Sequence, residues 1–372
     1  MTATRSSIPA VPGVITVDEV AATAATIAEL QLPDGMIPWF PGGHTDPWNH
    51  VESAMALTVT GRWAEAEAAY QWLADRQRPD GAWHNYYVAG RVSDPKFDTN
   101  CVAYVATGIW HHLLVTGDES FARLLFPVVD RALDYVLALQ TGRGEVIWAR
   151  RPDGSPWDYA LLTGSSSIAH SLACGHALAA RLGVGRPAWA EARRRLVRVI
   201  ATQPHAFEPK DRWAMDWYYP VLSGALTGAA ARRRLGERRD LFLMTGKGVR
   251  CVSDQPWVTA AETCECAMAY LAVGDEASAH DLFRWAQGLR GPDGDYFTGI
   301  VLPERVNFPA AERSSYTAAA VILAADALSG TSPASGLFVD HPPAVGETTV
   351  AGDAVPGTIR DHRAARGLSG GE

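Results

Sequence analysis

Apolar side chains recur at helical spacing through most of this 372-residue chain, and the segment from Trp48 to Trp83 shows the pattern most clearly. Its first half carries apolar residues four positions apart, at Val51, Met55 and Val59. Its second half repeats the pattern, at Ala66, Ala69, Tyr70 and Leu73. One face of an α-helix has this spacing, and Gly61 separates the two halves. The segment therefore predicts two helices joined by a tight turn, an αα-hairpin.

The same pattern predicts further helices along the chain. They are expected over about 17–31, 98–115, 119–140, 165–183, 187–202, 213–228, 229–246, 257–272, 276–289 and 311–329. A turn motif, Gln-x-x-x-Gly, ends several of them, as at Gln31–Gly35, Gln77–Gly81 and Gln140–Gly144. Repeated hairpins must stack to bury their apolar faces. About twelve helices in six hairpins predict an all-α fold, a closed (α/α)6 toroid over residues 15–330, with an open α-solenoid as the alternative.

The two ends of the chain lack this pattern. Residues 1–14 are polar and contain proline, which predicts a flexible N-terminal tail. Residues 331–372 are rich in Gly, Pro, Ser and Thr with little apolar periodicity. We expect a C-terminal tail that is mobile or packs loosely on the toroid.

Charge and composition exclude several classes of protein. The formal net charge is −8, and phosphate binding requires clustered Lys and Arg, so we expect no nucleic-acid partner. We interpret the basic run Arg193–Arg195 as a solvated helix face. No segment approaches about 18 consecutive apolar residues, and no signal peptide is recognisable, so we expect a cytoplasmic protein without a membrane span.

Cysteine and histidine spacing gives no metal site. The five cysteines are odd in number and scattered, which favours buried thiols over disulfides. No His-x-x-x-His or Cys-x-x-Cys pattern occurs, so we predict no metal and no cofactor. The sequence leaves the oligomeric state open.

Several segments between residues 36 and 329 carry a family resemblance. They are the helix Trp48–Leu57 with the following helix to Leu73, Lys96–Asp98, Asp153–Asp158, residues 269–283 and Asn307–Pro309. These segments resemble those of the glucoamylase-type glycosidases. Their order along the chain matches that family. The resemblance implies an α/α toroid whose carboxylates act as general acid and general base on a glycan or glycoconjugate.

The chain departs from that family at the catalytic positions. The family's Arg-Asp pair, which holds the sugar, is Glu52-Ser53 here, and its general-acid Glu is Asp158. The segment expected to hold the general base, Gly294–Gly299, keeps neither family carboxylate at its place. A shared fold does not carry the reaction with it.

Residues Gln77–Trp83 have the pattern Gln-x-x-x-Gly-x-Trp, which carries a second resemblance. The QW motif of terpenoid cyclases and prenyltransferase β-subunits, which are also α/α toroids, ends in this pattern. The Asp-x-Asp-Asp motif of class II cyclases does not occur, and Glu262–Cys264 is only a partial likeness of the prenyltransferase zinc segment. This resemblance implies an isoprenoid ligand as an alternative.

Carboxylates in the segments that lead into the inner helices are the catalytic candidates. We expect Asp158 to be the general acid, because it follows Trp157 in the segment that resembles the family's acid segment. An apolar wall there would raise its pKa. The general base is left open between Asp295, which is nearest to the family position in sequence, and Glu262 on the helix expected over 257–272.

The other candidates are expected to bind substrate. They are Trp48, Glu52, Asp98, Trp157, Asp216, Trp217 and Trp257. Indole faces suit the C–H surfaces of sugars, and carboxylates accept hydrogen bonds from hydroxyl groups. The alternative is a structural role, since a carboxylate ahead of a helix caps it and large aromatic side chains usually pack in the core.

Three hypotheses for function follow. The first is a carbohydrate-active enzyme that processes a small-molecule or oligosaccharide substrate in the central cavity by a glycoside hydrolase-like reaction. The second is a terpenoid cyclase or prenyltransferase-like protein. The third is a toroid that binds its ligand without catalysis.

Overall fold

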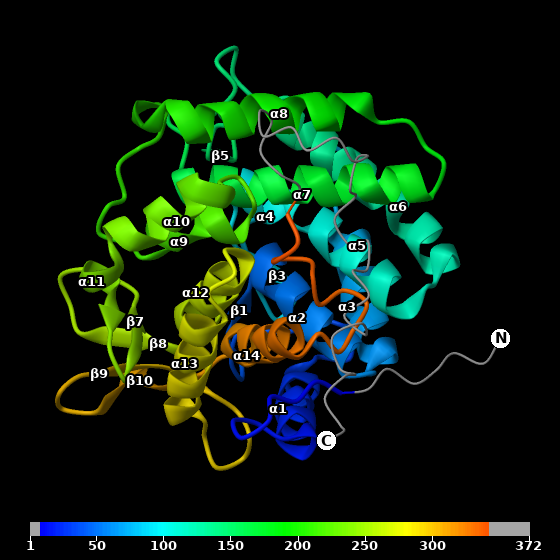
Figure 1. The fold of residues 1–372 in the computed structure, drawn as a ribbon. Coiled ribbons are helices and arrows are strands. Elements are labelled where there is room, and N and C mark those ends of the chain that lie inside the picture. Colours follow the sequence, from blue (N-terminus) through cyan, green and yellow to red (C-terminus); the bar gives the residue numbers. More distant parts are fainter. Residues whose placement is uncertain (1–7, 342–372) are drawn as a thin grey trace, which may run out of the picture.

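The structure is a computed structural model that describes residues 8–341. In this part of the chain an inner ring of helices surrounds a central axis (Figure 1). The ring consists of α2 (Pro47–Val59), α5 (Val105–Thr116) with the short α4 (Thr99–Ala103) ahead of it, α7 (Leu162–Arg181), α9 (Met215–Leu222), α12 (Ala260–Ala272) and α14 (Ser315–Ser329). Each inner helix packs against the next, and α14 packs against α2, which closes the ring. The predicted (α/α)6 toroid is confirmed, and the open solenoid is excluded.

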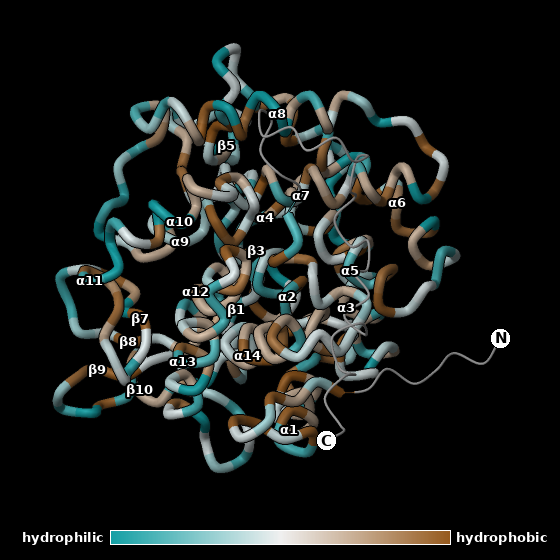
Figure 2. The backbone as a smooth tube through the Cα atoms, viewed as in Figure 1, coloured by the Kyte–Doolittle hydropathy of each residue, from teal (hydrophilic) through white to brown (hydrophobic). Residues whose placement is uncertain are grey.

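A second layer of helices lies outside the ring. It consists of α3 (Trp63–Arg76), α6 (Glu119–Leu137), α8 (Pro187–Thr202), α10 (Gly228–Glu237), α13 (Glu276–Ala286) and α1 (Val17–Leu30). The first five pack on the inner helix that precedes them, and α1 packs on α14. In Figure 1, α8 lies outside α7 at the top and α1 lies below α14. Figure 2 shows teal and brown alternating along α8, which buries Trp189 and Leu196 and exposes its polar face.

The repeated Gln-x-x-x-Gly motif ties neighbouring outer helices together. Each glutamine Nε2 donates both to the carbonyl of its own glycine and to a carbonyl of the next outer helix, over 2.8–3.0 Å: Gln31 to Glu65, Gln77 to Val128 and Gln140 to Ala192. No other residue fits at the glycine of the motif. At Gly81, φ is +93° and a Cβ would lie 2.2 Å from the Arg131 carbonyl oxygen. The motif therefore sets the spacing of the outer layer.

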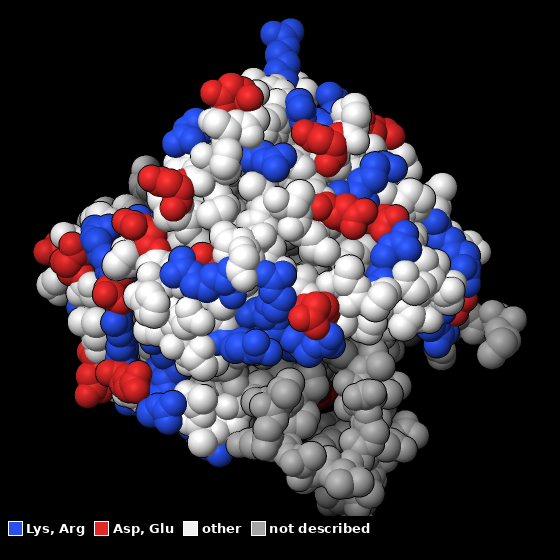
Figure 3. Space-filling model, turned by 90° about the horizontal axis from the view of Figure 1, so that it is seen from above, with Lys and Arg blue, Asp and Glu red and all other residues white. Residues whose placement is uncertain are grey.

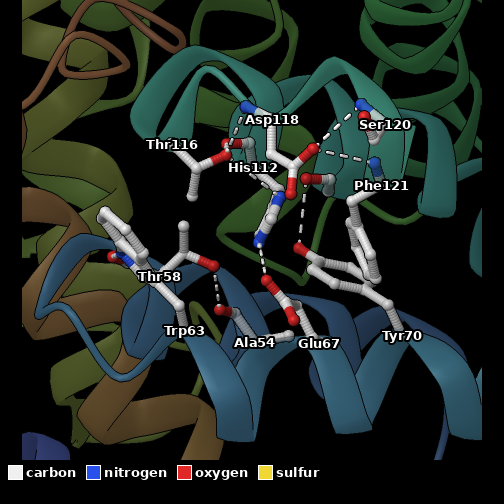
Figure 4. Close-up of polar contacts among 11 residues, drawn as sticks. Ala54, Thr58, Trp63, Glu67, Tyr70, His112, Thr116, Asp118, Ser120 and Phe121 are labelled. Atoms are coloured by element: carbon white, nitrogen blue, oxygen red, sulfur yellow. Dashed lines mark hydrogen bonds and ion pairs between the residues drawn. The ribbon is translucent and has the colours of Figure 1, made fainter. Parts of the chain in front are cut away.

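A close contact at Gly108 joins the first two hairpins. A Cβ on this α5 residue would lie 2.5 Å from Val51 of α2. The Tyr70 hydroxyl of α3 donates to the Gly108 carbonyl at 3.1 Å (Figure 4). Beside it, burial lowers the pKa of His112 to about 4. His112 is therefore neutral at pH 7, and its 3.8 Å distance to Glu67 is too long for a hydrogen bond.

Short antiparallel strands lead into several inner helices. One sheet has the order β10 (Val306–Arg313), β9 (Phe297–Val301), β8 (Trp257–Thr259), β7 (Gly248–Arg250) and β6 (Leu243–Met244). A second has the order β1 (His44–Thr45), β2 (Tyr86–Val88) and β3 (Arg91–Asp94), and β4 (Phe97–Asp98) pairs with β5 (Ala149–Arg150). Because β1, β4, β8 and β10 end at the starts of α2, α4, α12 and α14, they fix the loops at that rim.

These strands account for the errors in the predicted helix boundaries. The helix expected over 229–246 is wrong beyond residue 242, since α11 (Arg239–Phe242) is followed by the β6–β7 hairpin. Gly246 and Gly248 in that hairpin have φ of +74° and +134°, which no helix contains. The helices expected from 257 and 311 begin at Ala260 and Ser315, because β8 and β10 use the preceding residues.

Both predicted tails are partly folded. Val11 and Ile15 are 2% and 3% exposed and form a β-bridge with each other. At the other end, Leu337 and Phe338 are buried, and Phe338 stacks on His170 of α7 with ring centroids 4.9 Å apart. The apolar residues within 331–341 thus pack into the toroid, against the expectation of a loose tail from residue 331. The rest of the two predicted tails, 1–7 and 342–372, lies outside the described residues.

The surface is mixed in charge. Figure 3 shows Lys and Arg gathered near the middle of one face, with Asp and Glu beside them. In the basic run of α8, Arg194 pairs with Glu191 at 2.5 Å, and Arg195 donates to the Thr141 carbonyl at 2.6 Å. Across residues 8–341, no helix combines the length and the apolar character that crossing a membrane requires.

Candidate active site

Carboxylates gather where the inner helices begin. Asp46 and Asp98 are the N-caps of α2 and α4, and Asp216 and Glu262 lie in the first turns of α9 and α12. Free backbone N–H groups and the positive end of the helix dipole favour carboxylates there. Inner and outer helices alternate along the chain, so all inner helices begin at the same rim. This rim, with its strands and loops, is called the mouth below.

Asp46 is held by several donors. Its Oδ2 accepts from Trp39 Nε1 and Asn49 Nδ2, both at 2.8 Å, and its Oδ1 accepts the Asn49 backbone N–H at 3.0 Å. Burial raises the pKa of Asp46, and these donors oppose that rise. Trp39 packs edge-on against Tyr316 of α14, with centroids 4.8 Å apart. Asp46 therefore belongs to a wall that α2 and α14 share.

Asp98 lies beside Asp46 in the mouth. It accepts the backbone N–H groups of Asn100 and Cys101, and Trp148 Nε1 donates to its Oδ2 at 2.5 Å. Burial raises the pKa of Asp98, and the Lys96 charge opposes the rise. Burial first, and then the charges of Asp98 and Asp46, raise the pKa of the Cys101 thiol, so both carboxylates lie near that thiol.

Glu262 points from α12 into the ring. It is half-buried, burial raises its pKa, and its one hydrogen-bonding side chain within residues 8–341 is the Thr259 hydroxyl, which donates to Oε2. Burial and then the charge of Glu262 raise the pKa of Tyr316 on α14. Tyr316 also contacts Trp39. One side of the mouth is therefore lined, in order, by Asp46, Trp39, Tyr316 and Glu262.

A second pair of carboxylates lies deeper, at the floor. Glu52 of α2 and Glu265 of α12 are 7% and 9% exposed and line a cavity of about 10 Å³, which is about enough for one water molecule and far too small for a sugar ring. Trp48 Nε1 and the Tyr104 hydroxyl donate to Glu52 Oε1 at 2.8 and 3.1 Å. The Tyr218 hydroxyl donates to Glu265.

Glu265 was missed by the sequence reasoning. A signal was present: the residue stands inside the apolar run Cys264–Tyr270, where an ionisable side chain is rare unless it has a partner. Asp46 was missed as well, although Asp-Pro at positions 46 and 47 has the residue types of an N-cap followed by a first helical residue.

Aromatic side chains surround the mouth. Trp148 packs against Trp157 and stacks on Tyr159, with centroids 5.1 and 5.4 Å apart, next to α4. Trp257 stacks on Phe308 at 4.6 Å, next to the starts of α12 and α14. In the ring order α2, α5, α7, α9, α12 and α14, the helix with α4 lies opposite α12. Aromatic faces therefore flank the mouth on opposite sides.

Asp216 and Trp217 are adjacent in sequence but face different neighbours. Asp216 Oδ1 accepts the backbone N–H of Thr163 at 3.2 Å and its hydroxyl at 2.6 Å, which ties α9 to α7. Trp217 is fully buried, and its indole donates to the carbonyls of Arg234 and Leu235 of α10. Trp217 thus packs between inner and outer layers, away from the carboxylates.

The structure does not bring Asp158 and Asp295 to Glu262. Asp158 is exposed on the loop before α7 and makes no side-chain hydrogen bond within the described chain. Asp295 forms an ion pair with Arg313 at 2.7 Å and lines a groove against α1, whose lining does not include Glu262. Trp48 remains in the site, where it contacts Tyr104 and Tyr219 above the floor.

Comparisons with known proteins define the class of protein to which the fold belongs. No protein-family profile matches the chain. A wild-type glycosidase structure matches with a TM-score of 0.67 at 16% identity, over 85% of this chain and 97% of that one. A GH63 mannosylglycerate hydrolase from Thermus thermophilus in complex with glucose matches with a TM-score of 0.63 at 13% identity, over 82% and 99%. At such identities the likeness concerns the fold, which is that of the α/α-toroid glycosidases.

A relative with similar sequence identifies the family within this class of protein. The MMP endo-(1,4)-3-O-methyl-alpha-D-mannosidase of Mycolicibacterium hassiacum is 51% identical over 338 residues, which cover 90% of this chain and 94% of the relative. The chain belongs to the family of this enzyme. It is a glycan-acting glycoside hydrolase, as the first of the three hypotheses predicted, and the isoprenoid alternative receives no support.

Proposed function

We propose that this protein is an endo-acting hydrolase of an α-(1,4)-linked mannose polymer that carries 3-O-methyl groups. The mannosidase relative supports the substrate class. The observation that carries the endo mode is the placement of aromatic faces on opposite sides of the mouth, at Trp148–Trp157 and at Trp257–Phe308. Such faces can hold sugar units on both sides of the cleaved bond.

Glu262 is the proposed general acid. Burial raises its pKa, which favours the protonated form that a general acid needs for proton transfer to the glycosidic oxygen. The Thr259 hydroxyl can donate to the ionised form and accept from the protonated form, so both states of Glu262 are compatible with this contact.

Asp46 is the proposed general base. Its donors, Trp39 and Asn49, can bond only to an acceptor, so they favour the ionised carboxylate. In the reaction, Asp46 takes a proton from water, the water oxygen bonds to the anomeric carbon, and the bond from that carbon to the glycosidic oxygen breaks as Glu262 protonates the leaving oxygen. Asp98 and Trp48 are proposed to bind the sugar.

The experiment is a time course of the wild-type enzyme on a (1,4)-linked 3-O-methyl-α-D-mannan, with products sized by mass spectrometry. An endo enzyme releases oligosaccharides of mixed length before any monosaccharide accumulates. Release of monosaccharide alone would contradict the endo mode, and an unchanged polymer would contradict the substrate.

A cytoplasmic location is part of this proposal. All five cysteines are buried and none forms a disulfide in the described chain, which is usual for proteins of a reducing compartment. Labelling with a membrane-impermeant reagent in intact cells would place the protein outside the membrane if it were exported.

A further inference from the structure

A large groove lies next to the mouth, between α1 and the end of β10. Its volume is about 800 Å³, within the range of about 300–1,000 Å³ for ligand sites. One wall comes from Glu29 and Leu30 of α1, and Phe40 and Pro41 form its edge. The other wall is the segment 309–315, which carries β10 into α14. Figure 1 shows α1 below α14, with β10 leading toward it.

The groove and the mouth share one wall. The groove ends at Ser314 and Ser315, where α14 begins. Ser315 binds the loop that carries Phe40, since its backbone N–H donates to the Trp39 carbonyl at 2.7 Å. Trp39 faces the mouth and donates to Asp46, whereas its neighbour Phe40 lines the groove. The loop thus places the Trp39 ring at the mouth and the next ring, Phe40, in the groove.

The lining suits a neutral polymer with both hydroxyl and methyl groups. Its apolar members are Leu30, Phe40, Pro41, Pro309, Ala310 and Ala311. Its carboxylates are Glu29, Asp293, Asp295 and Glu312. Among the described residues that line the groove, the one basic side chain is Arg313, which is already paired with Asp295 at 2.7 Å and with Asp293 at 3.6 Å. Excess carboxylate disfavours a polyanion, accepts hydrogen bonds from sugar hydroxyls, and leaves the apolar side chains to contact O-methyl groups.

We propose that this groove is a distal subsite for the O-methylated mannose units of the chain that is cut at the mouth. The proposal rests on the proposed function, since it takes the methylated mannan as the substrate. Units bound in the groove hold the polymer in the mouth, and an oligosaccharide too short to reach Phe40 gains nothing from it. Binding energy gained far from the cleaved bond without change in the transition state lowers KM and leaves kcat unchanged.

The test compares a long and a short 3-O-methyl-α-(1,4)-mannan oligosaccharide on three variants. Phe40→Ala removes the aromatic edge, and Ala311→Trp fills the groove from an exposed position. Leu124→Ala on α6, a residue 64% exposed and outside the groove, is the matched control. We expect both groove variants to raise KM for the long substrate about tenfold, as the loss of one apolar contact region does, with no change for the short one or in the control.

The outcomes separate the two proposals. Wild-type enzyme that cleaves neither oligosaccharide overturns the proposed function. The subsite alone is overturned if wild-type enzyme cleaves both oligosaccharides but the groove variants do not distinguish them. In that case KM rises by the same factor for both oligosaccharides, or does not change for either. Thermal melts identify a variant that fails to fold, and Glu29→Gln, which changes an exposed side chain on the groove wall, then replaces it in the comparison.

Discussion

Glu52 on α2 and Glu265 on α12 face the same small cavity at the floor of the toroid, although they lie 213 positions apart in sequence (265 − 52). Burial and then the charge of Glu52 raise the pKa of Glu265 well above its ordinary value. Burial also raises the pKa of Glu52 to about 7. Two carboxyl groups that cannot easily ionise together retain a proton at a pH where isolated carboxyl groups would be ionised. The floor beneath the mouth is therefore less negative than its residues suggest.

The first prediction concerns the pH dependence of stability at this floor. A group whose pKa rises on folding stabilises the fold at pH values below its pKa in the unfolded chain, which is 4.5 for Glu52. That stabilisation is lost as the pH rises through the folded-state pKa of about 7. For Glu52 the loss amounts to about 3 kcal/mol. The free energy of unfolding of Glu52→Gln, relative to wild type, should therefore increase between pH 4.5 and pH 8 in urea titrations. A pH-independent difference between the two proteins would contradict the assigned burial.

The second prediction concerns a buried histidine and has the opposite sign. His50 accepts the Ile37 backbone N–H at Nδ1 and lies 2.9 Å from the Ala69 carbonyl at Nε2, so it is neutral with its proton on Nε2. Burial lowers its pKa to about 4. The neutral ring therefore stabilises the fold at pH values above 6.5, the pKa of histidine in the unfolded chain. This stabilisation is lost as the pH falls toward 4. An NMR titration should find the His50 ring neutral at pH 5.5, and a midpoint near 6.5 would refute the assignment.

The third prediction tests the Gln-x-x-x-Gly motif. Gln77→Ala removes two hydrogen bonds from Nε2 to buried carbonyls, and should lower the free energy of unfolding by about 1–3 kcal/mol. Gly81→Ala should cost more, because φ is positive and the Arg131 carbonyl blocks the Cβ. The control is Gln71→Ala, an exposed glutamine on α3, the helix that Gln77 follows as C-cap; among the described residues its side chain bonds only to Asp75. Equal melting temperatures for the Gln77 and Gln71 variants would show that the motif does not fix the outer layer.

The fourth prediction concerns the C-terminal segment that closes the floor. Phe338 is 7% exposed, stacks on His170 and lines the cavity of Glu52 and Glu265. Phe338→Ala should lower the free energy of unfolding by about 3–5 kcal/mol, as large-to-small core substitutions do. Urea unfolding measures this loss. A change of less than about 1 kcal/mol would mean that the segment packs loosely, as the sequence had suggested.

Most of the fold can be predicted from the sequence, but less of the candidate site can, for physical reasons. Helical periodicity and the Gln-x-x-x-Gly turns are local signals, and they led to the toroid. The site depends on which helices meet across the ring, so the proximity of Glu52 and Glu265 has no local signal. Adjacent residues also point in different directions, as Asp216 toward α7 and Trp217 toward α10 demonstrate.

The proposed acid and base are tested most directly by the turnover number of Glu262→Gln on the 3-O-methyl-α-(1,4)-mannan, measured beside Asp158→Asn and Asp46→Asn. Loss of a general acid or base should cost about 10²–10⁴-fold in kcat. We expect that loss for Glu262→Gln and Asp46→Asn, and near wild-type turnover for the exposed Asp158→Asn. Full turnover by Glu262→Gln together with inactive Asp158→Asn would contradict the role of Glu262 and identify Asp158 as the acid, as the family resemblance implied.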